Sequence, residues 1–192
     1  MKIKVELFNN KDLLIGTLKT LKLRIQKLIR KKLFEKEKTI LSENYAIDKN
    51  NVYSIIYGKK LVFEIIKNAD PASFRLIDFP KKINHLEKIY AKDKNNIYLY
   101  GAIIKDANLK TFKPLNSLYS KDKNSVFCYG KKIDADLKTF KIEWYVYAKD
   151  KNNIYYCGEI IKDADPKTFK IECEVYAKDK NNTYHFGEVE KT

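Results

Sequence analysis

Five copies of the triplet Asp-Lys-Asn are the first feature of the 192-residue chain that could do chemistry. Asp and Asn oxygens at alternate positions are ligands in calcium-binding loops. Such loops also need further carboxylates and usually a central glycine, whereas here a lysine follows each Asp and would repel a cation. We therefore interpret the triplet as a structural turn and predict no metal site. The turns begin at Asp48, Asp93, Asp122, Asp150 and Asp179.

Nucleophilic catalysis has little support in the sequence. A nucleophile needs a neighbouring base, and the two histidines, His85 and His185, are the candidates. His185 occupies a position that Leu, Cys or Tyr fills after other turns, which indicates packing, and His85 lies in an insertion that we expect to be exposed. The cysteines, Cys128, Cys157 and Cys173, lack CxxC spacing and are expected to be free thiols. No glycine-rich phosphate loop is visible. We expect neither an enzyme nor a cofactor.

The elements that position these residues form an internal repeat. The first interval between successive Asp-Lys-Asn triplets is long, and the later three are nearly equal, at about 29 residues. The long interval is a regular unit with insertions of seven residues before Ala69 and nine between Phe74 and Tyr90. A second marker recurs in phase, as ADPASF at 69–74, ANLKTF at 107–112, ADLKTF at 135–140 and ADPKTF at 164–169. Five of the six glycines also fall at matching places, namely Gly58, Gly101, Gly130, Gly158 and Gly187.

The unit around Asp150 predicts a hairpin. The Asp150 carboxylate can accept a backbone N–H two residues on, and Asn152 or Asn153 tolerates left-handed dihedrals, so we place a tight turn there. The apolar and aromatic run 154–157 predicts a strand that Gly158 ends.

The second marker predicts a helical turn after this hairpin. Asp165 suits the N-cap and Pro166 the first helical position, so the turn delivers Phe169 toward the core. Each unit of about 29 residues is then about three short antiparallel strands plus one helical turn. Such a unit is too small to bury its own apolar face, so stacked neighbours must share a core. A propeller blade, with about 40 residues and four strands, is disfavoured.

An aromatic residue five positions after each Asp predicts contacts between units. We interpret these residues as a core ladder, in which burying each ring would contribute roughly 2–3 kcal/mol. The ladder consists of Tyr53, Tyr98, Phe127, Tyr155 and Tyr184.

The DKNxxY hairpins, the glycine that follows them and the ADPxTF and YAKDKN segments resemble the DKNYY family of bacterial repeat proteins, over roughly residues 45–189. The resemblance implies a repeat fold. It implies no activity and no catalytic residues, because the family is known by its repeats. The chain departs from the pattern at Ile47, where a lysine is usual, and in its two insertions.

The N-terminal segment, residues 1–44, carries twelve basic and five acidic side chains and differs from the array at 45–192. Residues 2–8 alternate as in a short strand, and Asp12 could cap an amphipathic helix to about residue 36. The apolar stripe of this helix is Leu14, Leu18, Leu21, Ile25 and Leu28. The basic residues that could contact an anionic surface are Lys19, Lys22, Lys27, Arg30 and Lys31.

Three interpretations of this helix remain open. Its stripe could cap the first unit, since repeat arrays must cover their exposed end. It could lie in the plane of an anionic membrane through its basic face. It could instead pair with a partner helix.

The charge of +14 attracts anionic surfaces non-specifically. Specific nucleic-acid binding is not expected, because the tyrosines recur in phase like core residues and lysine exceeds arginine. No secretory signal or membrane-spanning run is apparent, so we expect a cytoplasmic or peripheral membrane protein without fixing its location.

The sequence therefore predicts a mainly β protein, built of tandem antiparallel β-meander repeats with an N-terminal amphipathic helix. We expect a non-enzymatic scaffold or binding module for an unknown protein partner. The alternative is a peripheral membrane or envelope-associated protein held by residues 12–36. An enzyme with its site in the insertion at 75–89 is a third hypothesis, which rests on Asp78, His85 and Glu87.

Overall fold

A computed structural model of the chain describes residues 38–79 and 88–190. The predicted strand at 2–8 and the amphipathic helix at 12–36 lie outside the described residues and stay predictions. The same holds for the five basic residues of that helix, and for His85 and Glu87.

The described chain is a row of five four-stranded antiparallel sheets, and each sheet is formed by four consecutive strands. The first contains β1 (Thr39–Ile40), β2 (Tyr45–Ile47), β3 (Val52–Ile56) and β4 (Val62–Ile65). The second contains β5 (Arg75–Leu76), β6 (Tyr90–Lys92), β7 (Ile97–Leu99) and β8 (Ala102–Ile103). The third contains β9 (Lys113–Pro114), β10 (Tyr119–Lys121), β11 (Val126–Cys128) and β12 (Lys131–Ile133). The fourth contains β13 (Lys141–Ile142), β14 (Tyr147–Lys149), β15 (Ile154–Tyr156) and β16 (Glu159–Ile160). The fifth contains β17 (Lys170–Ile171), β18 (Tyr176–Lys178), β19 (Thr183–His185) and β20 (Glu188–Val189).

The mainly β repeat fold is as predicted, but the expectation of three strands per unit is wrong. The segment between the helical turn and the Asp-Lys-Asn turn forms a strand, such as β13, which pairs with β14 through Lys141 opposite Lys149 and Ile142 opposite Ala148. Four strands fit into so short a unit because most of them are only two or three residues long. The strand count is therefore no argument against a blade-like unit.

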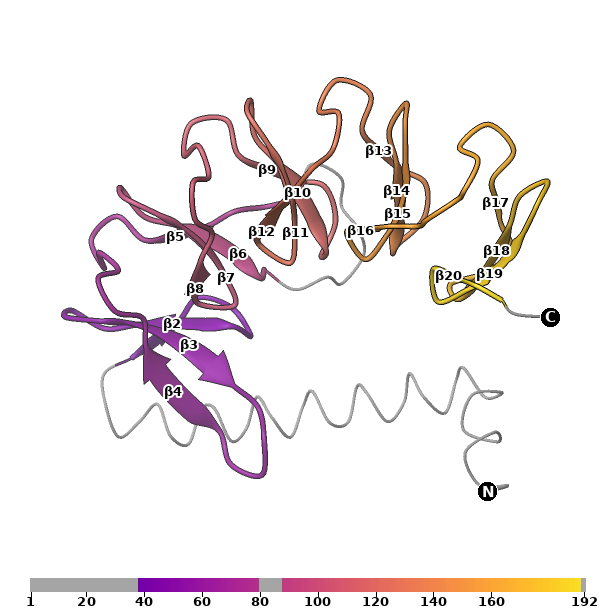
Figure 1. Ribbon diagram of the computed structural model, residues 1–192. Helices are drawn as coiled ribbons and strands as arrows, with labels where there is room; N and C mark the ends of the chain where they lie inside the picture. The colour runs from indigo at the N-terminus through magenta and orange to yellow at the C-terminus, as the bar shows by residue number, and fades with distance from the viewer. Residues whose placement is uncertain (1–37, 80–87, 191–192) are drawn as a thin grey trace.

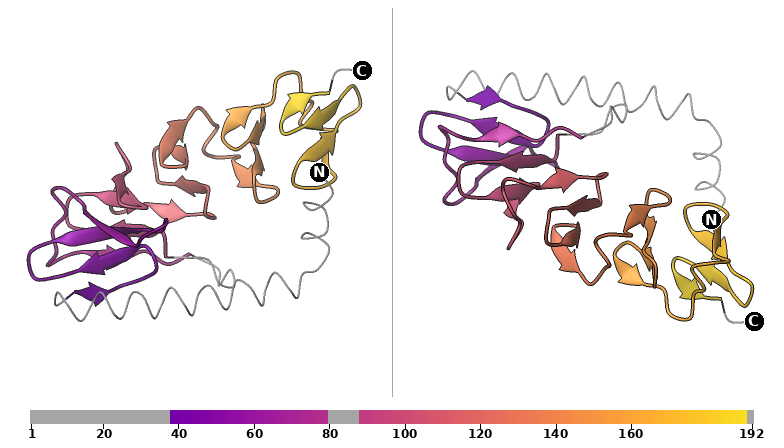
Figure 2. Two further views of the ribbon diagram at one scale, coloured as in Figure 1. Left: turned by 90° about the horizontal axis from the view of Figure 1, so that it is seen from below. Right: turned by 90° about the horizontal axis from the view of Figure 1, so that it is seen from above.

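The five sheets fan out side by side along an arc (Figure 1), and two further views show the same succession (Figure 2). On the convex side, narrow hairpin turns alternate with the wide loops that join one sheet to the next. The narrow turns are the Asp-Lys-Asn segments, and the wide loops hold the second marker. Both recurring motifs therefore lie along one edge of the array.

The two insertions belong to different sheets. The first lengthens the β3–β4 hairpin, where Val52–Ile56 pairs with Val62–Ile65 across residues 57–61. The second lies between β5 and β6, in the second sheet. The first sheet also begins before residue 45, because β1 pairs with β2.

In the second to fifth units, the other hairpin carries the left-handed backbone that we predict for Asn152 or Asn153. That prediction is wrong: neither Asn has a positive φ, whereas Cys157 (φ 49°) and Gly158 (φ 89°) both do. Positive φ at both central residues is the type I′ pattern that suits a two-residue hairpin. Gly58, which the sequence matches with Gly158, lies in the longer β3–β4 hairpin and has no positive φ.

The core runs between neighbouring sheets as a stack of three rings at each junction. Phe140, which ends the helical turn before β13, packs against Tyr119 of the preceding sheet and Tyr155 of its own, with ring centroids 5.7 and 5.9 Å apart. Phe169 joins Tyr147 to Tyr184 in the same way, at 5.9 and 5.4 Å. The helical turn therefore delivers its phenylalanine into the junction, where neighbouring units share buried residues.

Candidate functional site

Each Asp-Lys-Asn turn is organised by its carboxylate. Oδ1 of Asp150 accepts the N–H groups of Asn152 and Asn153, both at 2.8 Å. Oδ2 accepts the hydroxyl of Tyr155 at 2.7 Å and the N–H of Asp136, the first residue of the helical turn, at 2.8 Å. The Asp150 residue is 4% exposed. One carboxylate thus fixes the turn, the ladder tyrosine and the helical turn together.

The same arrangement recurs at Asp93 and Asp179. Asp122 lacks a hydroxyl donor, because Phe127 stands where the others have tyrosine, but it keeps its three N–H donors. At Asp48 the ammonium of Lys38 lies 3.7 Å from Oδ2.

Lys38 replaces a phenylalanine of the repeat. It directly precedes β1, as Phe140 precedes β13, and its Nζ lies 4.5 Å from the centroid of the Tyr53 ring. Where the other units insert an aromatic ring that reaches a preceding sheet, the first unit therefore has a cation stacked on its own ladder tyrosine.

These contacts favour the ionised form of the Asp48 and Asp179 carboxylates. Hydrogen bonds from the Tyr53 hydroxyl and from the turn N–H groups lower the pKa of Asp48 to about 2. Burial opposes ionisation of Asp179, but the N–H of Asp165 and the N–H groups of its own turn overcome it and lower the pKa to about 2. Burial raises the pKa of Tyr98 to about 12, and the hydrogen bond to Asp93 adds to that rise. Carboxylates this weakly basic, with several donors around them, are suited to holding structure and not to accepting protons.

A second set of tyrosines, at the start of the second strand of each sheet, cross-links the units unevenly. The Tyr119 hydroxyl donates to the carbonyl of Val146 at 3.0 Å and accepts the N–H of Gly158 at 2.8 Å, both in the next unit. Tyr45 makes the equivalent bonds to Ile89 and Gly101. The hydroxyl of Tyr147 is buried and has no hydrogen-bond partner among the described residues. Sequence reasoning missed this set, although the YAKDKN pattern repeats its tyrosine.

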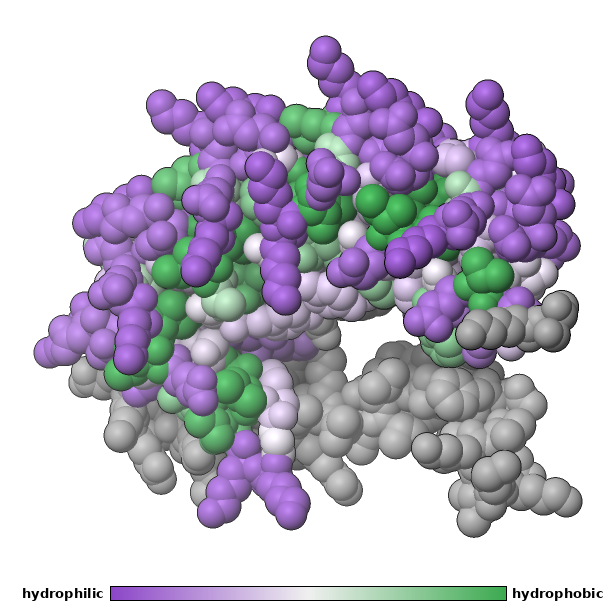
Figure 3. Space-filling model, viewed as in Figure 1, coloured by the Kyte–Doolittle hydropathy of each residue, from purple (hydrophilic) through white to green (hydrophobic). Residues whose placement is uncertain are grey.

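Large apolar side chains remain exposed at several turns. The first residue of the two-residue hairpin is aromatic and about half exposed at Tyr100, Tyr129 and Phe186. Trp144, at 52% exposed, and Tyr145 lie in the connection between β13 and β14. Separately, the surface in Figure 3 shows hydrophobic patches between hydrophilic side chains that project outward.

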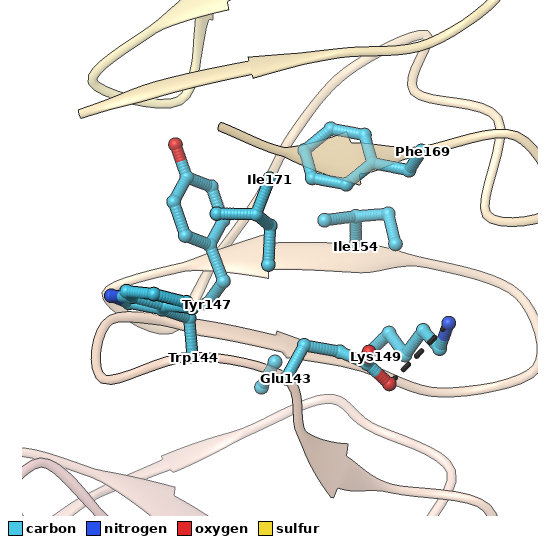
Figure 4. A pocket seen from close by; sticks show the side chains of 8 residues that line it. Glu143, Trp144, Tyr147, Lys149, Ile154, Phe169 and Ile171 are labelled. Carbon is cyan, nitrogen blue, oxygen red and sulfur yellow. Dashed lines mark ion pairs between the residues drawn. The ribbon is translucent and has the colours of Figure 1, made fainter. Parts of the chain in front are cut away.

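A pocket of about 250 Å³ opens between the fourth and fifth sheets. Trp144 and the ion pair of Glu143 with Lys149 lie at its two ends, with Ile154 and Ile171 between them (Figure 4). It is a hollow at the junction of two units, close to the exposed tryptophan.

The remaining candidates are scattered. His185 is half-buried and stacks on Tyr176 with ring centroids 4.5 Å apart, 14° from parallel. Asp78 is exposed and lies 3.6 Å from Lys88. The three cysteines carry no disulfide. Across residues 38–79 and 88–190, no group of three or more His, Cys, Asp or Glu side chains is placed to hold a metal ion. In the same ranges no helix has the length and hydrophobicity that crossing a membrane requires.

Sheets of four consecutive strands, carboxylate-centred turns and ring stacks shared between neighbours define a tandem β-repeat protein. The sequence model of the DKNYY family matches residues 15–129 and 45–188, and the chain belongs to this family, which confirms the resemblance. Comparison with curated proteins and with solved structures gave no match.

Proposed function

We propose that the array is a non-enzymatic binding module for a protein partner. The observation that carries the proposal is a separation of roles among the side chains. The recurring polar groups bond within the array, as Asp150 and Tyr155 do, whereas aromatic side chains such as Tyr129 and Trp144 are half exposed. Exposed aromatic and apolar side chains set among polar ones are typical of protein-binding surfaces.

The two-residue hairpins supply one part of this surface. Tyr100, Tyr129 and Phe186 occupy the same place in three units and have positive φ, at 50°, 48° and 52°. A bulky residue is strained in this conformation, where Asn would be preferred. The half-exposed ring of Tyr129 therefore supports a contact with a partner, whereas the ring of Phe186 also packs against His185 of its own unit, with centroids 4.4 Å apart.

The experiment compares two triple variants of the full chain. In the first, Tyr100→Asn, Tyr129→Asn and Phe186→Asn remove the rings while keeping a residue that favours positive φ. In the second, Lys123→Ser, Lys151→Ser and Lys180→Ser change the same number of residues at the opposite hairpins. Each tagged chain is used to capture proteins from the native host, with quantification by mass spectrometry and melting temperatures measured in parallel.

A protein that binds the wild type and the lysine variant, but not the aromatic variant, is the expected result. Equal capture by both variants, with unchanged melting temperatures, would remove the aromatic hairpins from the proposal. Loss in the lysine variant alone would show that charge drives the association instead.

A further inference from the structure

At the hollow between the fourth and fifth units, one position of the repeat differs from its counterparts in the first three units. The residue after the first strand of the unit donates its N–H to the tyrosine carbonyl of the second strand, as Leu115 does to Tyr119 at 2.8 Å. Glu143 makes the same bond to Tyr147 at 3.0 Å and therefore holds the equivalent position.

In the first three units this position carries an apolar side chain that fills the junction, which we call the plug. Leu41, Ile77 and Leu115 are each half-buried and pack against the core of their junction. In the fourth unit the charged side chain of Glu143 turns to the ammonium groups of Lys141 and Lys149, at 2.9 and 3.3 Å. The space that a leucine would fill is left as part of the hollow of about 250 Å³.

Both apolar and polar groups line the hollow. Tyr147, Ile154, Phe169 and Ile171 form the inner part, and the exposed indole of Trp144 stands at the end opposite Glu143 (Figure 4). The hydroxyl of Tyr147 is buried without a partner among the described residues, whereas the equivalent hydroxyl of Tyr119 has two. The hydroxyl of Tyr90 is also buried without a partner among the described residues, so this feature does not by itself mark the hollow.

We infer that the hollow binds one apolar side chain, of the size of leucine or phenylalanine, from an extended segment of a partner polypeptide. Its volume lies below the range of about 300–1,000 Å³ that is typical of whole small-molecule sites, so it suits a single side chain. Lys149 offers a donor and Glu143 an acceptor at the mouth, which matches the carbonyl and N–H of a peptide backbone. A buried aromatic or aliphatic anchor beside a tryptophan is a common centre of protein interfaces.

Two other ligand classes fit less well. A sugar would place hydroxyl groups against Ile154 and Ile171, where they would lose water without gaining hydrogen bonds. A cationic group would meet the ammonium groups of Lys141 and Lys149, which leave a net positive charge around the Glu143 carboxylate. The inference rests on the proposed binding function, because it names what one part of the module accepts.

Trp144 is the single tryptophan of the chain, so its fluorescence reports on this hollow. The full chain is titrated with N-acetyl-leucinamide and N-acetyl-phenylalaninamide, with N-acetyl-alaninamide and N-acetylglucosamine as comparisons. A ligand this small binds with a dissociation constant on the order of 1–10 mM. We expect saturation in that range for the leucine or phenylalanine amide, at least about tenfold weaker binding for alanine, and no saturable response to the sugar.

A matched pair of variants ties the response to the hollow. Glu143→Leu restores the plug of the first three units, so the saturable response should weaken at least about tenfold while the melting temperature rises by about 2–4 °C. Glu172→Leu alters the same repeat position in the fifth unit, outside the hollow, and should leave the dissociation constant unchanged.

Unchanged amide binding in the Glu143→Leu chain, saturation by the sugar instead of the amides, or no saturable response to any probe up to about 50 mM would each overturn the inference. The titration needs no partner protein, so its outcome is independent of the capture experiment with the aromatic hairpins. Either experiment can fail while the other succeeds.

Discussion

Replacing Tyr155 by phenylalanine tests how much the carboxylate-centred turn contributes to stability. The tyrosine is fully buried, and its hydroxyl lies 2.7 Å from Oδ2 of Asp150. Hydrogen bonds to charged groups contribute roughly 1.5–3 kcal/mol. Asp150 would keep its three N–H donors at 2.8 Å, so no buried charge is left without a partner. We therefore expect Tyr155→Phe to lower the free energy of unfolding by about 1.5–3 kcal/mol.

Two further substitutions calibrate this value. Tyr155→Ala also removes the ring that packs on Phe140 and should cost about 3–5 kcal/mol. Phe127→Tyr performs the reverse experiment in the third unit, where Asp122 has no hydroxyl donor, and should stabilise the chain by about 1 kcal/mol.

Urea unfolding followed by circular dichroism gives each free energy of unfolding. An equal slope of this free energy against urea concentration shows that the variants unfold as the wild type does. A loss below about 0.5 kcal/mol for Tyr155→Phe, with Tyr155→Ala in its expected range, would mean that the ring alone stabilises the unit and that the short hydroxyl contact contributes nothing. That result would refute the role assigned to the carboxylate.

Three shorter predictions follow from other contacts. Gly158→Ala should cost at least about 2 kcal/mol in urea unfolding, because φ is +89° and the new Cβ would lie 2.6 Å from that of Cys128, whereas Gly58→Ala meets only an ordinary contact at 3.8 Å and should stay within about 0.5 kcal/mol. The pKa of Asp179 is about 2 in the folded chain against 3.8 ordinarily, so its stabilising effect is complete above about pH 4 and lost as the pH falls toward 2. In the Asp179→Asn variant the urea midpoint should therefore depend less on pH between about 4 and 2 than in the wild type. An equal dependence on pH in both chains would contradict this. Lys38→Met removes the ion pair and the cation on the Tyr53 ring and should lower stability by about 1 kcal/mol, while a neutral result would deny Lys38 a role at this end of the array.

The repeat itself could be predicted because its signals are local. An Asp followed by N–H groups two and three residues on makes the same turn in any context. An Asp before Pro likewise starts a helical turn: the N–H of Phe169 donates to the carbonyl of Asp165 at 3.0 Å. Stacking then follows from size alone, since so short a unit cannot bury these rings by itself.

The fourth strand and the left-handed turn could not be predicted in the same way. β13 is two residues long, too short for alternation to be visible, and only its pairing with β14 defines it. The left-handed residue Cys157 carries no propensity for that conformation, whereas Asn152 does. The Asp150 carboxylate holds the Asn turn in an ordinary conformation, so a specific hydrogen-bonded contact overrides the intrinsic preference.

The sequence does contain a sign of the hollow, but only when the copies of the repeat are compared for differences. Leu41, Ile77 and Leu115 share one place in the repeat, and Glu143 breaks the series. Recurrence marks the residues that build the fold. A departure from recurrence at a position otherwise apolar marks where the fold has been altered.

The residues that hold the fold and the residues that line the mouth of the hollow are different, so the binding proposal can be tested without removing the contacts that hold the fold. Glu143 and Trp144 contribute no side-chain hydrogen bond to the turn at Asp150 and no ring to the stack at Phe140. Changing Glu143 to the leucine that the third unit carries at this place therefore alters the hollow and removes the ion pairs with Lys141 and Lys149, while the turn at Asp150 and the ring stack at Phe140 stay intact. A measured melting temperature that is not lowered in that variant would show that a lost response does not come from unfolding.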